Sequence, residues 1–287
     1  AEAIVFDGVE RAVAQDPRMA ASLLRLHFHD CFVNGCDASV LLDDTATMTG
    51  EKTAAPNANS LRGFEVIDSI KAELEFACPC IVSCADILAI AARDSVVLTG
   101  GSAWQVQLGR RDSRTANKNL ANNNLPAPTS DVPTLTQKFK NVGLSQEDMV
   151  TLSGAHTIGK ARCATFSARL QNQPDPTLEK VMLTSLQKLC FNGFSNNNSN
   201  AVTNLDMETP LTFDNEYYKN LPSGQGLLNS DQVLYSTGGS TRNLVEFYMQ
   251  NQDEFFHNFK ISMMKMGNIQ PLLGKHGEIR RNCRFSN

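Results

Sequence analysis

The sequence lacks the features by which membrane, nucleic-acid and zinc-binding proteins are most easily recognised. No apolar run reaches the roughly 18 residues that a membrane span needs, because charged residues such as Asp86 and Arg93 interrupt the best stretch. The net charge is -4, so the chain has no excess of positive charge for a polyanion. Paired C-x-x-C knuckles of a zinc domain are also missing. We therefore expect neither a membrane nor a nucleic acid as a partner.

Convincing strands of alternating polar and apolar residues are scarce as well, and helical spacing dominates. Residues 61–77 and 245–267 carry apolar side chains at helical intervals. Ser83 and Ser145 are each followed three residues later by an aspartate, a pattern typical of helix starts. With 287 residues the chain can bury a substantial core. We predict a mainly α fold with very little β-structure.

Eight cysteines at long separations favour disulfides made in an oxidising compartment. The glycosylation sequon at Asn197 lies in an asparagine-rich stretch, which suits an exposed loop. The chain starts without an initiator methionine or the pattern of a signal peptide, so we expect a processed or truncated chain. Together these features predict a secreted glycoprotein.

The stretch RLHFHDCF, which begins at Arg25, concentrates polar and reactive groups on what otherwise resembles an apolar helix. Helical geometry points Arg25, Phe28 and His29 to roughly one side. A cation beside an imidazole tends to keep the ring neutral, which suits a general base. His27 is better interpreted as a structural histidine. A zinc site formed by His27, His29 and Cys31 is disfavoured, because alternate residues on a helix diverge.

The loop that follows gathers oxygen donors at Asp30, Asp37 and Ser39. Oxygen donors crowded into a short loop suit a hard cation such as calcium. A second histidine, His156, ends a helical pattern near a glycine-flanked turn. Taken alone, His156 fits a core position better than a ligand position.

Six stretches together resemble the plant secretory haem peroxidases of class III. They are RLHFHDCFVNGCDAS (25–39), VSCADIL (82–88), LGRRDS (108–113), NLPAP (124–128), LSGAHTIG (152–159) and FDNEYY (213–218). The resemblance implies one haem peroxidase domain over residues 1–287, with two helical halves that sandwich haem b, iron protoporphyrin IX. The distal half would comprise about 1–130 and 270–287, and the proximal half about 131–269.

The resemblance also implies the reaction and the residues that perform it. Hydrogen peroxide would be reduced to water, and small phenolic or related aromatic donors would be oxidised in successive one-electron steps. His29 would be the general acid and base, Arg25 would stabilise charge, and Phe28 would limit access. Asn57 would accept a hydrogen bond from His29.

On the other side of the haem, His156 would be the axial iron ligand. Asp231 would accept a hydrogen bond from its far nitrogen, although an aspartate in this sequence context is otherwise an ordinary helix cap. Donors would bind near Pro126, where Thr129 and Ser130 stand in place of the aromatics of many relatives. We expect a monomer.

Two calcium ions belong to the implied cofactors. The matched ligands of the first are Asp30, Val33, Gly35, Asp37 and Ser39. The matched ligands of the second are Thr157, Asp206, Thr209, Thr212 and Asp214. Since Asp30 and Thr157 directly follow His29 and His156, each ion would hold one of these histidines in place.

The resemblance implies three disulfides, Cys31–Cys36, Cys84–Cys283 and Cys163–Cys190. Cys78 would pair with an N-terminal cysteine that this sequence does not contain, and Cys80 has no counterpart in the family pattern. These two cysteines could be free thiols, a strained pair or an error in the sequence.

Two other readings compete with a secreted peroxidase of the cell wall, apoplast or vacuole. A non-catalytic secreted calcium-binding protein on a peroxidase scaffold would lack the haem ligand or the distal pair, but both are present. An intracellular haem enzyme would have few disulfides and no paired calcium sites.

Overall fold

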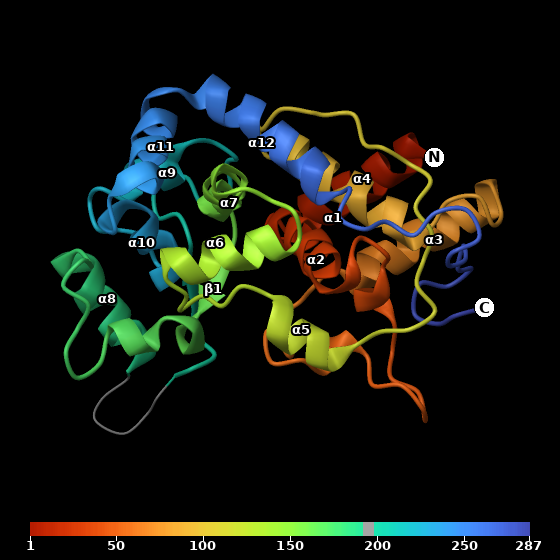
Figure 1. The fold of residues 1–287 in the computed structure, drawn as a ribbon, viewed down its shortest axis with the longest axis horizontal. Helices are drawn as coiled ribbons and strands as arrows, with labels where there is room; N and C mark the ends of the chain where they lie inside the picture. Colours follow the sequence, from red (N-terminus) through yellow and green to blue (C-terminus); the bar gives the residue numbers. More distant parts are fainter. Residues whose placement is uncertain (192–197) are drawn as a thin grey trace. The chain divides into compact units, whose positions relative to one another are not determined.

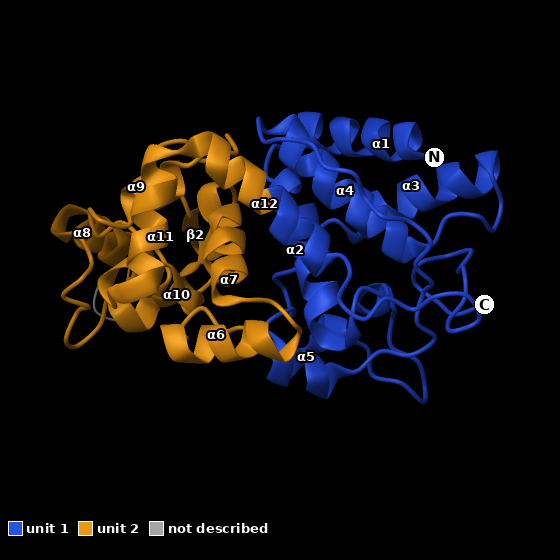
Figure 2. Cartoon of the chain, turned by 45° about the horizontal axis from the view of Figure 1, so that its top comes forward, with its two compact units in different colours: residues 1–125, 260–287 blue, residues 126–259 orange. Residues whose placement is uncertain are grey.

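The computed structural model describes residues 1–191 and 198–287, which form two compact units (Figure 2). Unit 1 comprises residues 1–125 and 260–287, and unit 2 comprises residues 126–259. Both boundaries fall somewhat before the expected positions, 130 and 269. Asn197, the predicted glycosylation site, lies outside the described residues.

Unit 1 contains five α-helices and two short 3-10 helices among the described residues (Figure 1). They are α1 (Glu2–Gln15), α2 (Met19–Asn34), η1 (Ser39–Leu41), η2 (Glu51–Thr53), α3 (Phe64–Ala77), α4 (Cys84–Leu98) and α5 (Lys118–Asn124). A further helix, α12 (Gln252–Met266), begins in unit 2 and ends in unit 1.

Unit 2 is also helical. Its helices are α6 (Val132–Asn141), α7 (Gln146–Ser153), η3 (Gly154–Thr157), η4 (Cys163–Thr165), η5 (Ser167–Arg169), α8 (Lys180–Cys190), α9 (Glu216–Asn220), α10 (Asn229–Ser236) and α11 (Gly239–Gln250). The described residues form one small antiparallel sheet, in which β1 (Lys160–Arg162) pairs with β2 (Val202–Asn204). The predicted mainly α fold with very little β-structure is confirmed.

Helix α2 is buried on more than one side because it packs against α1, α4 and α5. Its Leu23 and Leu26 are fully buried in an apolar cluster that also contains Ile87 and Ile90 of α4. His27, His29 and Asp30 are buried on the same helix. These three polar residues of RLHFHDCF therefore lie inside the protein, where each needs a specific partner, while Arg25 is part-buried.

An aromatic cluster forms part of the core of unit 2. The ring of Phe213 stacks on that of Phe255, with 5.7 Å between ring centroids, and Phe255 also contacts Tyr218 and Tyr248. Gly154, at the end of α7, faces this cluster, and a Cβ atom there would lie 2.4 Å from the Tyr218 hydroxyl. Position 154, two residues before His156, therefore requires glycine, because a Cβ atom would collide with this cluster.

Helix starts follow the predicted capping patterns, whereas one predicted helix is interrupted. The side-chain oxygen of Ser83 accepts the backbone N–H of Asp86 at the start of α4, and Ser145 forms a reciprocal capping box with Asp148 at the start of α7. The expectation of one continuous helix over 245–267 is wrong. The chain breaks between α11 and α12 at Asn251, whose backbone leaves the helical region and whose amide caps the carbonyl of Phe247.

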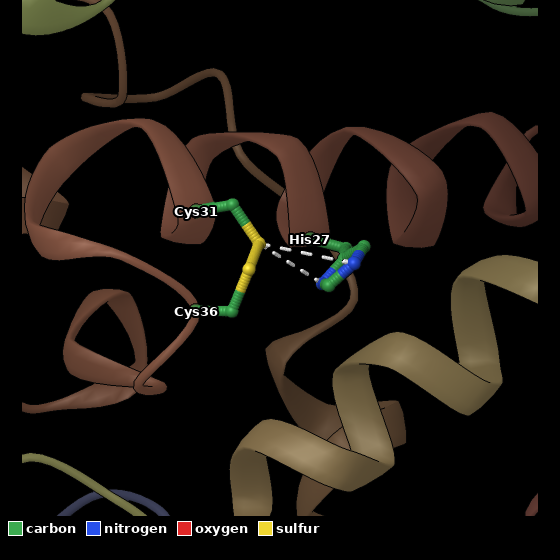
Figure 3. Close-up of side chains that lie close together, drawn as sticks. All are labelled: His27, Cys31 and Cys36. Atoms are coloured by element: carbon green, nitrogen blue, oxygen red, sulfur yellow. Dashed lines mark hydrogen bonds between the residues drawn. A yellow bond between two sulfur atoms is a disulfide. The ribbon is translucent and has the colours of Figure 1, made fainter. Parts of the chain in front are cut away.

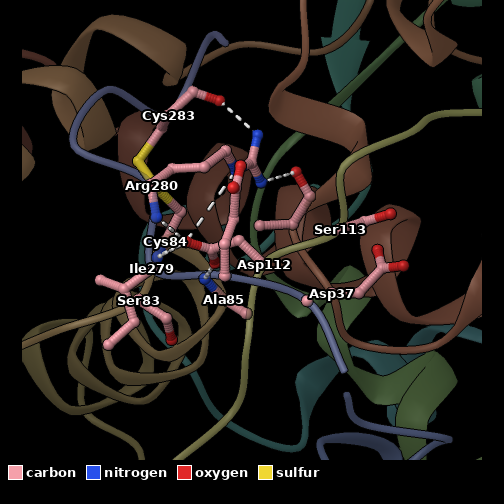
Figure 4. Close-up of polar contacts among 12 residues, drawn as sticks. Asp37, Ser83, Cys84, Ala85, Asp112, Ser113, Ile279, Arg280 and Cys283 are labelled. Atoms are coloured by element: carbon pink, nitrogen blue, oxygen red, sulfur yellow. Dashed lines mark hydrogen bonds and ion pairs between the residues drawn. A yellow bond between two sulfur atoms is a disulfide. The ribbon is translucent and has the colours of Figure 1, made fainter. Parts of the chain in front are cut away.

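The C-terminal segment of unit 1 is joined to α4 by a buried polar network (Figure 4). Asp112 accepts the backbone N–H groups of Cys84, Ala85 and Arg280. The fully buried guanidinium of Arg280 donates to the carbonyls of Ala38 and Cys283, both at 2.6 Å. The Cys84–Cys283 disulfide lies in the same network and closes the chain over 199 positions.

The structure contains all three disulfides implied by the resemblance, Cys31–Cys36, Cys84–Cys283 and Cys163–Cys190. Within the described part of the chain, Cys78 and Cys80 form no disulfide, and Cys80 is exposed. None of the described helices combines the length and apolar character of a bilayer-spanning segment.

We predict that the Cys84–Cys283 bridge stabilises the fold more than Cys163–Cys190. A Cys84→Ala/Cys283→Ala variant should lose about 2–5 kcal/mol of unfolding free energy, because the bridge restricts a long loop in the unfolded chain. The Cys163→Ala/Cys190→Ala variant, with a separation of only 27, is the matched control. It should lose about 1–2 kcal/mol less. Equilibrium unfolding in guanidinium chloride measures both losses, and an equal or larger loss for the shorter bridge contradicts the prediction.

Candidate active site

His29 is fixed in orientation by a side chain from a separate loop. Its Nδ1 lies 2.6 Å from Oδ1 of Asn57. The Asn57 amide nitrogen donates to the carbonyl of Glu51 at 2.9 Å, so its oxygen is the atom that faces the ring. Nδ1 of His29 therefore carries the proton and donates it, which leaves Nε2 as an acceptor.

The surroundings of His29 keep its ring neutral. Burial holds the pKa of His29 well below its usual range, and the nearby positive charge of Arg25 lowers this pKa further. The hydrogen bond to Asn57 offsets part of that decrease. A buried neutral imidazole with a free acceptor nitrogen can take up a proton from a bound molecule.

Arg25 connects α2 to the loop that carries Asn57. Its Nη1 donates to the carbonyl and the hydroxyl of Ser60, at 3.1 and 2.7 Å, and its Nη2 donates to the carbonyl of Pro56 at 3.0 Å. Phe28 is half-buried beside these residues, and its ring meets that of His29 edge to face, with 5.3 Å between centroids. The predicted quartet Arg25, Phe28, His29 and Asn57 thus lies together in unit 1.

The loop after α2 folds around the predicted oxygen donors of unit 1. Asp30 accepts the N–H of Ala38 at 2.9 Å, and Asp37 accepts the N–H of Ser39 at 2.9 Å. The carbonyl oxygen of Val33 accepts the side-chain amide N–H of Asn124 and keeps a second lone pair for another partner.

Gly35, another predicted donor in this loop, has a φ of +101°. A Cβ atom on this residue would lie 2.6 Å from the carbonyl oxygen of Gln270. Only glycine meets both requirements.

Three carboxylates are buried close to one another, Asp30 of α2, Asp37 of the loop that follows it and Glu51 of η2. Burial raises the pKa of Asp30 well above its usual range, and the charge of Asp37 raises it further. Burial likewise raises the pKa of Asp37, and it raises that of Glu51 to about 7. Glu51 was missed in the sequence, because it lies in η2, outside the local motif. This set of oxygen donors fits a hard cation, which would stabilise the crowded negative charge.

In unit 2, His156 is held by Asp231 as expected from the resemblance. Its Nδ1 lies 2.7 Å from Oδ1 of Asp231, which comes from the first turn of α10. Oδ2 of the same carboxylate accepts the N–H of Leu228 at 3.0 Å, so Asp231 also caps its helix. The His156 side chain is 37% exposed, whereas that of Asp231 is 2% exposed. The ring thus presents its Nε2 edge away from the carboxylate, where it can bind a metal.

The predicted oxygen donors of unit 2 gather directly beside His156. The hydroxyl of Thr157 lies 3.2 Å from Asp206 and 3.0 Å from Asp214. Thr209 lies 3.4 Å from Asp206 through its hydroxyl, and its carbonyl accepts the N–H of Thr212. Segments far apart in the sequence therefore meet in one oxygen-rich site.

His27 lies against the Cys31–Cys36 disulfide (Figure 3). Its two ring nitrogens are 3.6 and 3.8 Å from the sulfur of Cys31. Burial, together with the charge of Arg110, lowers the pKa of His27 to about 3, so the ring is neutral. The bonded sulfurs are not thiolates, which zinc requires. The geometry fits a packed structural histidine.

The segment around Pro126 is braced against the helix that carries Asp231. The carbonyls of Thr129 and Ser130 accept the amide of Asn229, and the carbonyl of Pro128 accepts the N–H of Ser230. Pro126 itself is half-buried. A second residue whose role the sequence did not reveal is Tyr217, which lies within the FDNEYY motif and whose hydroxyl donates to Asp231.

Comparison with known proteins gives consistent matches. The model of the family described as Peroxidase matches residues 5–251. Peroxidase 40 of Arabidopsis thaliana is 60% identical over 292 residues, which cover 100% of this chain and 82% of the relative. Peroxidase 4 of Vitis vinifera is 56% identical over 283 residues, which cover 97% of this chain and 87% of the relative.

Peroxidase 9 of Arabidopsis thaliana is 55% identical over 293 residues, which cover 100% of this chain and 84% of that protein. These matches span both compact units. They do not favour a non-catalytic calcium-binding protein. The chain belongs to the peroxidase family, within the class III plant peroxidases, and is a haem-dependent enzyme that acts on hydrogen peroxide and reducing substrates.

Proposed function

We propose that His156 binds the haem iron through Nε2 and that His29 and Arg25 activate hydrogen peroxide. The observation that carries this proposal is the state of the two imidazoles. Each donates its Nδ1 proton to a fixed acceptor, Asn57 in one case and Asp231 in the other, so each keeps a free Nε2. A partly exposed imidazole held by a buried carboxylate is well suited to be an axial ligand of haem iron.

Haem, when bound, supplies the one-electron redox chemistry that couples peroxide reduction to donor oxidation. The residues of the chain manage protons and charge. Nε2 of His29 accepts a proton from hydrogen peroxide and returns it to the departing oxygen, so that water leaves. The low pKa of His29 keeps the ring neutral, so Nε2 carries no proton and can accept one. The hydrogen bond to Asn57 prevents the ring from turning or changing tautomer.

Arg25 stabilises the negative charge that develops as the oxygen–oxygen bond breaks. Its guanidinium is always protonated and is anchored to the carbonyls of Pro56 and Ser60. A charge that is oriented before the reaction stabilises a transition state at little reorganisation cost. The same charge lowers the pKa of His29, so the two residues act as one unit.

Two calcium ions occupy the oxygen-rich sites of units 1 and 2 in this proposal. The buried carboxylates Asp30 and Asp37 support the first, and Asp206 and Asp214 beside the Thr157 hydroxyl support the second. Because each site is adjacent in sequence to a histidine, loss of an ion would loosen that histidine before the fold is lost.

The electron donors are small phenolic or related aromatic molecules that bind near Pro126. The exposed side chain of Thr129 gives this region a polar rim, which offers weak stacking to a ring. Three disulfides support export to an oxidising compartment, the cell wall or apoplast, with the vacuole as a second location. Glycosylation at Asn197 and a monomeric state complete the proposal.

The axial assignment predicts that His156→Ala abolishes stable haem binding, because the iron loses its protein ligand. Gel filtration followed by absorption spectroscopy measures the haem that remains bound. His257→Ala, which changes an exposed histidine of α12, should keep its full haem content. Added imidazole should restore haem binding to His156→Ala. Retention of haem by this variant without imidazole argues for another axial ligand.

The distal assignment predicts that His29→Gln lowers the second-order rate constant for consumption of hydrogen peroxide about 10²–10⁴-fold, because the general base is lost. Asn57→Val should cause a smaller loss, since the base remains but loses its orientation. Stopped-flow absorption spectroscopy measures the rate, with exposed His276→Gln as the control. A wild-type rate in His29→Gln would falsify the assignment.

The calcium assignment predicts two calcium ions per chain by elemental analysis and one in either Asp37→Asn or Asp214→Asn. Chelation should lower turnover by at least about tenfold while far-UV circular dichroism stays unchanged, because the ions orient residues next to the histidines. Asp253→Asn, at an exposed carboxylate of α12, should keep both ions. Unchanged turnover after both ions are demonstrably removed would defeat this assignment.

A further inference from the structure

The carboxylate of Asp231 accepts more than the hydrogen bond from His156. The hydroxyl of Tyr217 donates to the same oxygen, Oδ1, at 3.1 Å, while Nδ1 of His156 lies at 2.7 Å. The other oxygen accepts the N–H of Leu228. One buried carboxylate therefore serves three donors, two of which share a single oxygen.

Tyr217 is held so that its hydroxyl points at that oxygen. It lies in the short helix α9, which packs against η3, the element that carries His156. Its ring meets the ring of His156 edge to face at 6.2 Å and packs against Tyr218 at 5.1 Å. Tyr217 is 2% exposed, so no competing water-facing position is open to the phenol.

Sharing an oxygen has an electronic consequence. A carboxylate attracts the Nδ1 proton of an imidazole, and the stronger that attraction, the more negative charge the ring carries toward its metal. A phenol that donates to the same oxygen stabilises the charge on the carboxylate and weakens its pull on the ring. The effect is strong here because Tyr217 and Asp231 are both buried, and buried hydrogen bonds act in a low dielectric.

We propose that Tyr217 is a positioning residue that limits the electron donation of His156 to the haem iron by sharing the charge of Asp231. The proposal rests on the assignment of His156 as the axial ligand and adds a residue that sets its strength. Burial and the charge of Asp231 raise the pKa of Tyr217 well above its usual range, so the phenol stays protonated and remains a donor.

The test is the variant Tyr217→Phe, which removes the hydroxyl and keeps the ring. Its matched control is Tyr218→Phe, because Tyr218 is the adjacent residue, is equally buried and donates only to the backbone carbonyls of Val150 and Thr151. Two properties of the haem-loaded proteins are measured. They are the reduction potential of the iron and the iron–imidazole stretching frequency in the resonance Raman spectrum of the reduced protein.

Tyr217→Phe should shift the potential to a more negative value and the iron–imidazole band to a higher frequency, because Asp231 then pulls harder on His156. Tyr218→Phe should move neither property. In an Asp231→Asn background the effect of Tyr217→Phe should vanish, because the charge to be shared is gone. Thermal unfolding of each variant reports whether a shift reflects general loosening, which would affect Tyr218→Phe equally.

The outcomes separate this proposal from the assignment on which it rests. If the wild-type protein shows an iron–imidazole band and this band has the same or a lower frequency in Tyr217→Phe, charge sharing is wrong and the axial assignment stands. The same conclusion follows if Tyr217→Phe has its full effect in the Asp231→Asn background. If the wild-type protein shows no iron–imidazole band, or if His156→Ala keeps it, both ideas fail.

Discussion

This active site depends on one constraint, which is the identity of the group that accepts the Nδ1 hydrogen bond of each histidine. A histidine has two ring nitrogens, and a proton fixed on one of them determines the chemistry of the other. Here the acceptors differ in charge. His29 meets the neutral amide of Asn57, which orients the ring without making it strongly basic. His156 meets the carboxylate of Asp231, which increases the electron density that the ring offers to a metal.

The residues around these acceptors belong to the same arrangement. Asn57 is oriented by the carbonyl of Glu51, and Glu51 lies among the buried carboxylates of the first proposed calcium site. Asp231 is oriented by Leu228 and shared with Tyr217. Each histidine is thus coupled to an ion site or a hydrogen-bond network beyond its direct partner. A substitution two contacts away can therefore change the chemistry without touching the reacting molecules.

Sequence reasoning succeeded where the determining contacts are local. The caps at Ser83 and Ser145 and the helical spacing in the chain predicted the start of α4, the start of α7 and the mainly α class. It failed at Asn251, where a single residue breaks a pattern that remains apolar at helical intervals on both sides. The pattern records which face is buried, but it does not record where the chain leaves the helix.

The candidate site shows the same division. Its central residues were identified through family motifs, which are contiguous in sequence. Glu51 was missed because it lies outside these motifs, and the role of Tyr217, although the residue lies within FDNEYY, was missed because it depends on a contact with Asp231, 14 residues away. No pattern in a single sequence distinguishes a tyrosine that donates to a carboxylate from one that only packs.

The bridge between Cys84 and Cys283 has a consequence for the chain after damage. A protease that cuts one exposed loop between these two positions produces two fragments, yet the sulfur–sulfur bond still connects them. Such a nicked molecule would migrate as one band in a denaturing gel without reductant and as two bands with it. A sample that looks fragmented under reducing conditions can therefore consist of nicked molecules whose two fragments are still covalently joined.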